Sequence, residues 1–280
     1  MASITQWTVG HGRDIGLGHR SRLMGVLNVT PDSFSDGGRH LDVEAAIAHA
    51  YRLREAGADI IDIGGESTRP GAEPVDALEE QRRILPVIAG LAASDMILSV
   101  DTYRASTARL AIEAGAHIVN DVWGAQREPE IARVAAATGA GLCLMHTGRD
   151  RAVLADPVAD QAHFLAQSLR IARAAGVEED AIVLDPGFGF GKEAAQNFEL
   201  LRRFAEVAAC FDRPWLVGTS RKRFVRQAVG PAGDADFGTA ATSVILRLAG
   251  AAIFRVHDVA VNRDALALAD AMLAGAGEAR

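Results

Sequence analysis

Cysteine and lysine are both scarce in this chain. Of its 280 residues, two are cysteines, Cys143 and Cys210, and no motif surrounds either of them. This excludes a disulfide framework or a zinc cluster, so each cysteine is expected to be a small buried residue. Lysine also occurs twice, at Lys192 and Lys222, although lysine and arginine together number 29. All other basic positions among these 29 are arginine, which suggests that the two lysine positions need a compact ammonium group.

An excess of positive charge and long apolar stretches are also lacking. The formal net charge of −7 argues against a broad nucleic-acid-binding face, although a few basic residues can still form an anion pocket. No stretch reaches the ~20 apolar residues of a membrane span. Residues 1–20 contain no apolar core of a signal peptide. We therefore expect a cytoplasmic protein that binds neither nucleic acid nor membranes.

What the chain does contain is a repeated pattern of short apolar runs, each followed by a turn and an amphipathic segment. Eight such runs occur, at 22–28, 59–64, 96–101, 116–121, 141–146, 181–185, 215–219 and 253–258. They are nearly continuous in apolar residues, as is typical of parallel strands buried on both faces. Eight β-then-α units predict the α/β class and a (β/α)8 TIM barrel, with residues 1–280 as one domain. Residues 1–21 form an extension before the first strand that could cap the bottom of the barrel. An open doubly wound sheet is the alternative, but no dinucleotide fingerprint is present.

The amphipathic segments predict helices between the strands. They cover about 43–57, 75–93, 104–115, 129–138, 158–176, 195–210, 237–250 and 259–274. Asp42 is a candidate N-cap for the first helix. Gly57, Gly115, Gly139 and Gly176 are candidate stops before the following strands.

Polar residues stand at the end of nearly every predicted strand. They are Asn28, Asp62 with Glu66, Asp101, Asn120 with Asp121, His146, Asp185, Ser220 with Lys222, and Arg255 with His257. In a parallel barrel these carboxyl ends share one face, and that face holds the active site. One polar strand end is as often structural as functional, but a full set predicts a polar site.

Two loops that follow strands have a composition suited to anions. Residues 28–38 and 64–71 are long and rich in Gly, Ser, Thr and Pro, and the second contains Arg69, whose planar guanidinium matches phosphate oxygens. Ordinary βα loops have only about two to six residues. An anion-binding role is therefore favoured over that of an ordinary polar loop.

Residues 185–192 (DPGFGFGK) form a third glycine-rich loop, which has neither the P-loop nor the dinucleotide spacing. Its glycines allow the backbone to approach a flat ligand, with Phe188 or Phe190 available to stack. No His, Cys and Asp cluster has zinc spacing. A Mg²⁺ ion shared between protein oxygens and a substrate phosphate is compatible with these residues.

These motifs together resemble the dihydropteroate synthase family. Residues 24–38 (MGVLNVTPDSFSDGG) are similar to its first signature, and residues 62–71 (DIGGESTRPG) to its second. The remaining motifs follow in the same order, at 99–102, 118–121, 185–192, 218–222 and 255–259. The resemblance covers about residues 22–275.

The resemblance implies roles for the matching positions. Asp101, Asn120, Asp185 and Lys222 would bind the pterin ring, because a carboxylate can accept two parallel bonds from its amidine-like edge. The diphosphate would be bound by Asn28, Thr68, Arg69, Arg255 and His257, with Asn28 also a Mg²⁺ ligand. Pro70, Phe190 and Ser220 would border p-aminobenzoate. Met145 and Gly218 complete the predicted substrate-binding set, and Asp101, Asp185, Lys222 and Arg255 would carry catalysis.

The implied reaction joins 7,8-dihydropterin-6-ylmethyl diphosphate to p-aminobenzoate, giving 7,8-dihydropteroate and diphosphate in folate biosynthesis. It needs no covalent enzyme intermediate and no assigned general base. Family membership also implies a homodimer, formed through the late helices, and inhibition by sulfonamides. The alternatives are a pterin-dependent methyltransferase of the same superfamily, which would not need the phosphate-binding residues, and a non-catalytic paralogue.

The sequence departs from the family pattern at two places. Residues 147–149 read Thr-Gly-Arg where the family commonly has Met-Arg-Gly, and Arg223 stands where serine is common. Both departures lie near loops over the predicted pocket. The departures therefore affect loop details and inhibitor contacts, and they remove none of the predicted ligand-binding positions.

Overall fold

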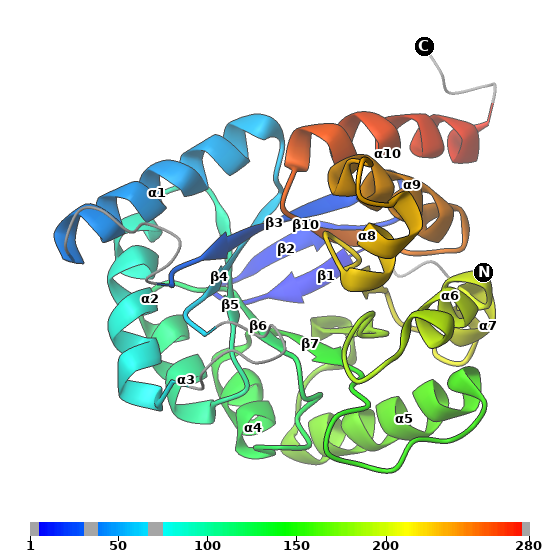
Figure 1. The fold of residues 1–280 in the computed structure, drawn as a ribbon. Helices are drawn as coiled ribbons and strands as arrows, with labels where there is room; N and C mark the ends of the chain where they lie inside the picture. The colour runs from blue at the N-terminus through cyan, green and yellow to red at the C-terminus, as the bar shows by residue number, and fades with distance from the viewer. Residues whose placement is uncertain (1–5, 31–38, 67–74, 276–280) are drawn as a thin grey trace.

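Eight parallel strands form the centre of the molecule and helices surround them (Figure 1). The computed structural model describes residues 6–30, 39–66 and 75–275. The strands are β3 (Arg22–Asn28), β4 (Ile60–Gly64), β5 (Ile97–Asp101), β6 (Ile118–Asp121), β7 (Gly141–Met145), β8 (Ile182–Asp185), β9 (Leu216–Val217) and β10 (Ile253–Val256). Their order in the sheet is β8-β7-β6-β5-β4-β3-β10-β9. An isolated bridge between Leu184 and Trp215 joins β8 to β9, so the sheet is a nearly closed TIM barrel, as predicted.

The helices lie outside the strands. They are α1 (Arg39–Ala56), α2 (Ala77–Leu91), α3 (Ala105–Glu113), α4 (Glu130–Thr138), α5 (Pro157–Ala175), α6 (Ala194–Arg202), α7 (Phe204–Ala209), α8 (Arg223–Val229), α9 (Ala235–Leu248) and α10 (Val259–Ala274), with a 3₁₀ turn at Glu179–Ala181. The apolar sides of the strands and helices meet in one continuous core. This core fixes the strands, and with them the direction of the side chains at their carboxyl ends.

Several helix boundaries differ from the sequence-based expectation. α1 begins at Arg39, so Asp42 lies inside the helix and is not its N-cap. The predicted helix 195–210 is broken at Arg203 into α6 and α7, and Phe204 at the start of α7 packs edge-on against Trp215. α8 was not predicted. The four glycine stops are confirmed in place: each follows a helix and has a positive φ that favours glycine.

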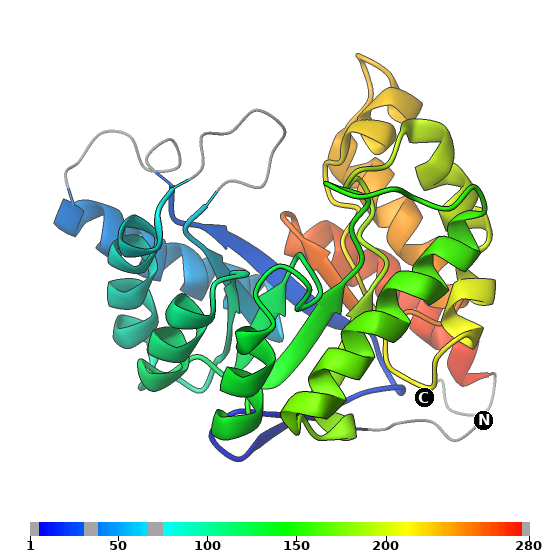
Figure 2. The ribbon, with the colours of Figure 1, turned by 90° about the horizontal axis from the view of Figure 1, so that it is seen from below.

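An N-terminal hairpin fills the end of the barrel opposite the loops that follow the strands (Figure 2). It consists of β1 (Gln6–Val9) and β2 (Arg13–Gly16), paired antiparallel. Trp7 is fully buried and donates a hydrogen bond from Nε1 to the Ala181 carbonyl (2.9 Å). The apolar side chains of the hairpin join those from the amino-terminal parts of the strands in a second core cluster, which includes Met24, Ile60 and Ile118. The hairpin therefore seals the barrel interior from below.

The two cysteines differ in environment. Cys143 is buried on β7, as predicted, and burial raises its pKa well above the usual range. Cys210 is exposed, which contradicts the prediction, because it lies at the end of α7, where the chain turns away from the core. Among the helices of the described residues, none is long and apolar enough to span a bilayer.

Candidate active site

The carboxyl ends of the strands collect most of the residues predicted from the sequence. Asn28, Asp101, Met145 and Asp185 are the last residues of β3, β5, β7 and β8. Asn120 lies on β6, next to its last residue, and Arg255 on β10. Gly218, Ser220 and Lys222 follow β9, and His257 follows β10. Thr68, Arg69 and Pro70, with most of both predicted anion loops, lie outside the described residues.

Asp62 on β4 is the centre of the buried polar network, although no ligand-binding role was predicted for it. Its carboxylate, which has no exposed surface, accepts hydrogen bonds from Ser99 Oγ (2.6 Å), Asn120 Nδ2 (3.2 Å) and Arg255 Nε (2.6 Å). The sequence showed only that Asp62 lies near the end of a predicted strand. The residues that bond to Asp62 come from other strands, so spacing along the chain could not show that they meet at its carboxylate.

Arg255 joins two carboxylates across the barrel. Besides Asp62, it donates from a terminal nitrogen to Asp101 Oδ2 (2.7 Å). Burial raises the pKa of Asp101, and the Arg255 charge opposes that rise. The same two carboxylates raise the pKa of Arg255, against the effect of burial, so its guanidinium stays charged. The predicted phosphate-binding residue thus lies within the group of predicted pterin-binding residues.

Asp185 and Lys222 face the network from the other side of the barrel. Burial raises the pKa of Asp185 to about 6, although the Gly187 amide donates to its Oδ1 (2.7 Å) and Lys222 lies near. Burial and the neighbouring Arg255 lower the pKa of Lys222 to about 8. Both values fall within reach of neutral pH, which is common in functional sites.

Apolar side chains form a wall beside these charged groups. Val122, Met145 and Phe190 make a small buried cluster, against which Tyr103 and Trp123 pack. The Lys222 ammonium lies 4.0 Å from the centre of the Phe190 ring, and the Arg149 guanidinium lies 4.6 Å from it. A flat ligand here would have an apolar face and a polar edge within reach, as small-molecule sites usually provide.

Ser220 and His257 form a separate pair at the β9 and β10 ends. Ser220 Oγ lies 2.9 Å from His257 Nδ1 and also accepts a bond from the His257 backbone amide (3.1 Å). Burial, followed by the charge of Arg255, lowers the pKa of His257 to about 3, so the imidazole is neutral. A neutral imidazole can donate a hydrogen bond to an anion but adds no charge.

The two departures from the family pattern differ in their consequences. Gly148 and Gly191 bring two loops together: a Cβ on Gly148 would lie 2.5 Å from the Gly191 carbonyl oxygen. Arg149 follows directly and packs on Phe190, so this departure changes the wall of the site. Arg223 begins α8 and is exposed.

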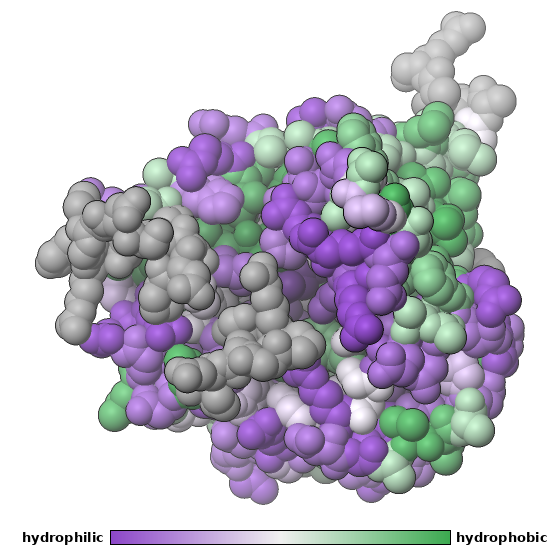
Figure 3. Space-filling model, viewed as in Figure 1, coloured by the Kyte–Doolittle hydropathy of each residue, from purple (hydrophilic) through white to green (hydrophobic). Residues whose placement is uncertain are grey.

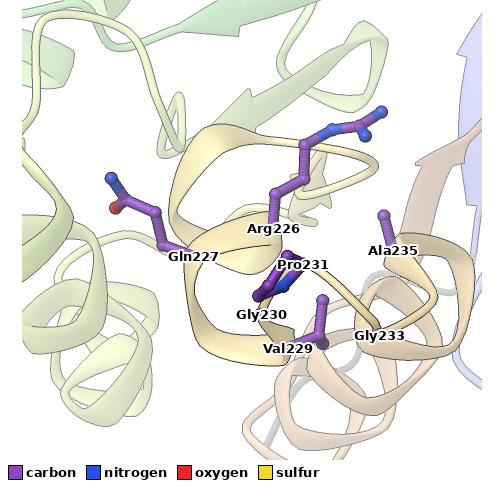
Figure 4. A pocket seen from close by; sticks show the side chains of 7 residues that line it. All are labelled: Arg226, Gln227, Val229, Gly230, Pro231, Gly233 and Ala235. Carbon is purple, nitrogen blue, oxygen red and sulfur yellow. The ribbon is translucent and has the colours of Figure 1, made fainter.

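The surface around the strand ends is mostly hydrophilic in the view along the barrel (Figure 3). A hollow of about 330 Å³ lies elsewhere, lined by Arg226, Gln227, Val229, Gly230, Pro231, Gly233 and Ala235 around the α8–α9 connection (Figure 4). It contains none of the predicted site residues and no buried charged group. We therefore assign the site to the strand ends.

The comparisons with known proteins agree with this geometry. The chain matches the family model described as pterin binding enzyme over residues 24–257. The chain belongs to the dihydropteroate synthase family of pterin-binding enzymes. A dihydropteroate synthase from Clostridium beijerinckii is 42% identical over 261 residues, covering 92% of this chain and 96% of the relative.

Two solved structures extend the comparison. The dihydropteroate synthase of Xanthomonas albilineans with 4-aminobenzoic acid has a TM-score of 0.88 and 42% identity, covering 96% of this chain and 99% of its own. That of Yersinia pestis in a sulfonamide drug complex has a TM-score of 0.86 and 41% identity, with 96% and 99% covered. The chain is thus a transferase of folate biosynthesis, and the methyltransferase alternative is not supported.

Proposed function

We propose that the strand-end cluster is the site at which this dihydropteroate synthase joins 7,8-dihydropterin-6-ylmethyl diphosphate to p-aminobenzoate. The observation that carries the proposal is the convergence of Asp62, Asp101, Asn120, Asp185 and Arg255, from five strands, beside an apolar wall. Burying this many charged groups is costly unless each is paired or forms hydrogen bonds. A flat ligand with polar edges would supply hydrogen-bond partners for them.

The pterin ring would bind between Asp101, Asn120, Asp185 and Lys222. Asp185 has one carboxylate oxygen, Oδ1, bonded to the Gly187 amide. A carboxylate can accept further bonds, and an amidine-like edge supplies a parallel donor pair. Met145 would cover one face of the ring. Asp101 and Asp185 would also favour positive charge that develops on the pterin as diphosphate leaves.

The diphosphate would be bound by Arg255 and His257, with Asn28, Thr68 and Arg69. Arg255 is held by Asp62 and Asp101, which keeps its guanidinium in a fixed position beside the predicted pterin-binding residues. Such pre-organisation stabilises the leaving group without reorganisation during the reaction. Gly218 lies beside Arg255: a Cβ on Gly218 would be 3.7 Å from Arg255 Cβ, an ordinary van der Waals contact.

Mg²⁺ is proposed as the cofactor, with Asn28 as its protein ligand. The described residues contain no group of three His, Cys, Asp or Glu side chains that could hold a metal by themselves. This fits an ion that takes one amide oxygen from the protein and the rest of its shell from phosphate oxygens and water, as Mg²⁺ often does. Bound there, it would neutralise charge on the diphosphate.

p-Aminobenzoate would lie near Ser220, Phe190 and Pro70, with its amine facing the pterin methylene. The bound 4-aminobenzoic acid of the Xanthomonas albilineans relative supports this substrate. The arylamine nitrogen attacks the methylene carbon, the carbon–oxygen bond to diphosphate breaks, and the amine then loses its proton to solvent. Catalysis comes from positioning and from stabilising the leaving diphosphate.

Release of diphosphate by the purified protein tests the proposal. The pterin diphosphate and Mg²⁺ are supplied with and without p-aminobenzoate. Release that requires p-aminobenzoate, together with dihydropteroate formation, is the expected result. Release without it would indicate a hydrolase, and no release under both conditions would favour the non-catalytic paralogue.

We also propose that the protein is a cytoplasmic homodimer that pairs through α9 and α10. These neighbouring helices expose Phe237 (67%), Leu268 (67%) and Met272 (63%), and apolar surface lies over them at the right of Figure 3. Exposed apolar patches of this kind often mark interfaces. Leu268→Glu is expected to convert a dimer to a monomer in sedimentation, whereas Leu78→Glu, at an exposed position on α2, should not. An unchanged mass of Leu268→Glu would place the interface elsewhere.

A further inference from the structure

Lys192 lies outside the residues assigned to the substrates, yet its ammonium makes a distinctive set of contacts. Nζ lies 2.8 Å from the Gly187 carbonyl, 3.3 Å from the Phe190 carbonyl and 2.9 Å from His146 Nδ1. A lysine ammonium has three donors and no acceptor. All three donors thus have an acceptor, and two of these belong to the loop that carries Phe190.

The acceptor role of His146 fixes its protonation. With Nδ1 accepting from Lys192, Nε2 carries the hydrogen and donates it to Asp160 Oδ2 (2.9 Å). Arg151 Nη2 lies 2.8 Å from the same Nε2 and donates to Asp160 Oδ2 instead. Burial and the Lys192 charge lower the pKa of His146 to about 4, in agreement with a neutral ring. Asp160 on α5 also accepts two bonds from Arg151 (2.9 and 2.5 Å) and one from the Leu154 amide (2.8 Å). The chain of contacts thus runs from a helix outside the barrel to the loop after β8.

This chain of contacts ends at the wall of the site. The Phe190 carbonyl also accepts a bond from the Gly148 amide (3.1 Å), and the Gly189 amide donates to Asn197 Oδ1 (2.7 Å). The glycines of the loop have positive φ and so hold little conformational preference of their own. The order of the loop therefore depends on its contacts, and Lys192 and the Asp185 carboxylate provide the charged ones.

We propose that Lys192 is a positioning residue for p-aminobenzoate: through His146 and Asp160, it fixes the loop that presents the Phe190 ring to the substrate and to Lys222. The inference rests on the proposed place of Phe190 beside p-aminobenzoate. It also accounts for the lysine at this position in a chain of 29 basic residues with two lysines. A compact ammonium can reach three converging acceptors, whereas a planar guanidinium cannot.

Steady-state kinetics of Lys192→Met test the inference. Loss of charged hydrogen bonds is expected to raise KM for p-aminobenzoate about tenfold or more, with kcat and KM for the pterin diphosphate within about threefold. Arg202→Met, which removes an exposed cation from neighbouring α6, is the matched control and should leave all three constants unchanged. Equal changes in both KM values, or a loss of thermal stability alone, would overturn the role.

Two substitutions of His146 separate chemistry from packing. Glutamine can accept from Lys192 and donate to Asp160, whereas leucine can do neither. His146→Gln is expected to keep KM for p-aminobenzoate within about threefold of wild type, and His146→Leu to match Lys192→Met. Equal behaviour of the two His146 variants would contradict the inference, and this comparison remains available if Lys192→Met does not fold.

Amide hydrogen exchange gives a readout that does not depend on turnover. Residues 187–191 are expected to exchange faster in Lys192→Met and His146→Leu than in wild type, His146→Gln and Arg202→Met. Unchanged exchange would overturn the positioning role even if the wild-type enzyme is active. If wild type makes no product but Lys192→Met and His146→Leu still exchange faster than wild type, Lys192 keeps its role in ordering the loop and the proposed function is rejected instead.

Discussion

The two ends of the barrel are built from the same eight strands but contain opposite kinds of side chain. At the amino-terminal end, the β1–β2 hairpin and the strand interiors form an apolar cluster around Trp7. At the carboxyl end, buried Asp62, Asn120 and Asp185 meet Arg255 and Lys222. One end thus stabilises the fold, whereas the other holds charged groups whose burial costs stability and is compensated only by their pairing. In barrel enzymes this division is general.

Trp7→Ala should give the largest effect on stability and little effect on catalysis. Truncating a fully buried aromatic residue costs about 3–5 kcal/mol of the free energy of unfolding. The site lies at the other end, so the KM values of the folded fraction should not change. Urea unfolding and kinetics at low temperature measure the two quantities. A large change in either KM would mean that the two ends are coupled.

Among substitutions at the carboxyl end of the barrel, Arg255→Ala should weaken substrate binding most. It removes the proposed phosphate ligand and leaves Asp62 and Asp101 without their shared cation, so the pterin diphosphate should bind about 2–5 kcal/mol more weakly. The binding of free pterin should weaken far less. Calorimetric titration of Arg255→Ala with each ligand measures the two changes in binding free energy. Equal changes would mean that Arg255 does not bind the diphosphate.

Asp185→Asn should weaken pterin binding without unfolding the protein. A charge-assisted bond is lost, which corresponds to about 1.5–3 kcal/mol. Asparagine keeps an oxygen for the Gly187 amide, so the loop should keep its position. An unchanged pterin affinity would exclude Asp185 from the pterin site.

Below about pH 6, binding and stability should depend on pH in opposite directions. Asp185, with its pKa raised to about 6, must be ionised to accept bonds from the pterin, and Lys222, with its pKa lowered to about 8, must be charged. Pterin affinity should therefore be highest between these values and fall up to about tenfold per pH unit outside them.

Folding stability should respond in the other direction. Burial raises the pKa of Asp185 to about 6 and of Asp121 to about 7, so from about pH 4 to 7 the folded protein binds more protons than the unfolded chain. The free energy of unfolding from these groups should fall as pH rises through that window. A urea-unfolding series across this pH range measures it, and a rise would contradict the burial effect.

The sequence predicted most of the fold because its signal is local. Apolar runs located all eight strands within two residues or so, and glycines marked four helix ends. The hairpin, α8 and the break at Arg203 were missed, since the first two elements are short and the break accompanies the packing of Phe204 against Trp215, a tertiary contact. Asp42 failed as an N-cap because α1 begins earlier.

Site membership was also predictable, but the pairing within the site was not. The strand-end positions of Asp101, Asp185 and Arg255 were evident from the chain. The contact between Asp62 and Arg255, which are 193 residues apart, depends on barrel closure. The link from Lys192 to His146 likewise joins two loops. Thr68, Arg69 and Pro70 remain predictions, because they lie outside the described residues.

The most direct test compares the rate of dihydropteroate formation in wild type, Asp185→Asn and Trp7→Ala, at a temperature at which all three proteins are folded. We predict that wild type needs the pterin diphosphate, p-aminobenzoate and Mg²⁺ together. Asp185→Asn should lose most of the wild-type kcat/KM for the pterin diphosphate, whereas folded Trp7→Ala should have the same kcat/KM as wild type. Full activity of Asp185→Asn beside a loss in folded Trp7→Ala would contradict the assignment of catalysis to the carboxyl end of the barrel.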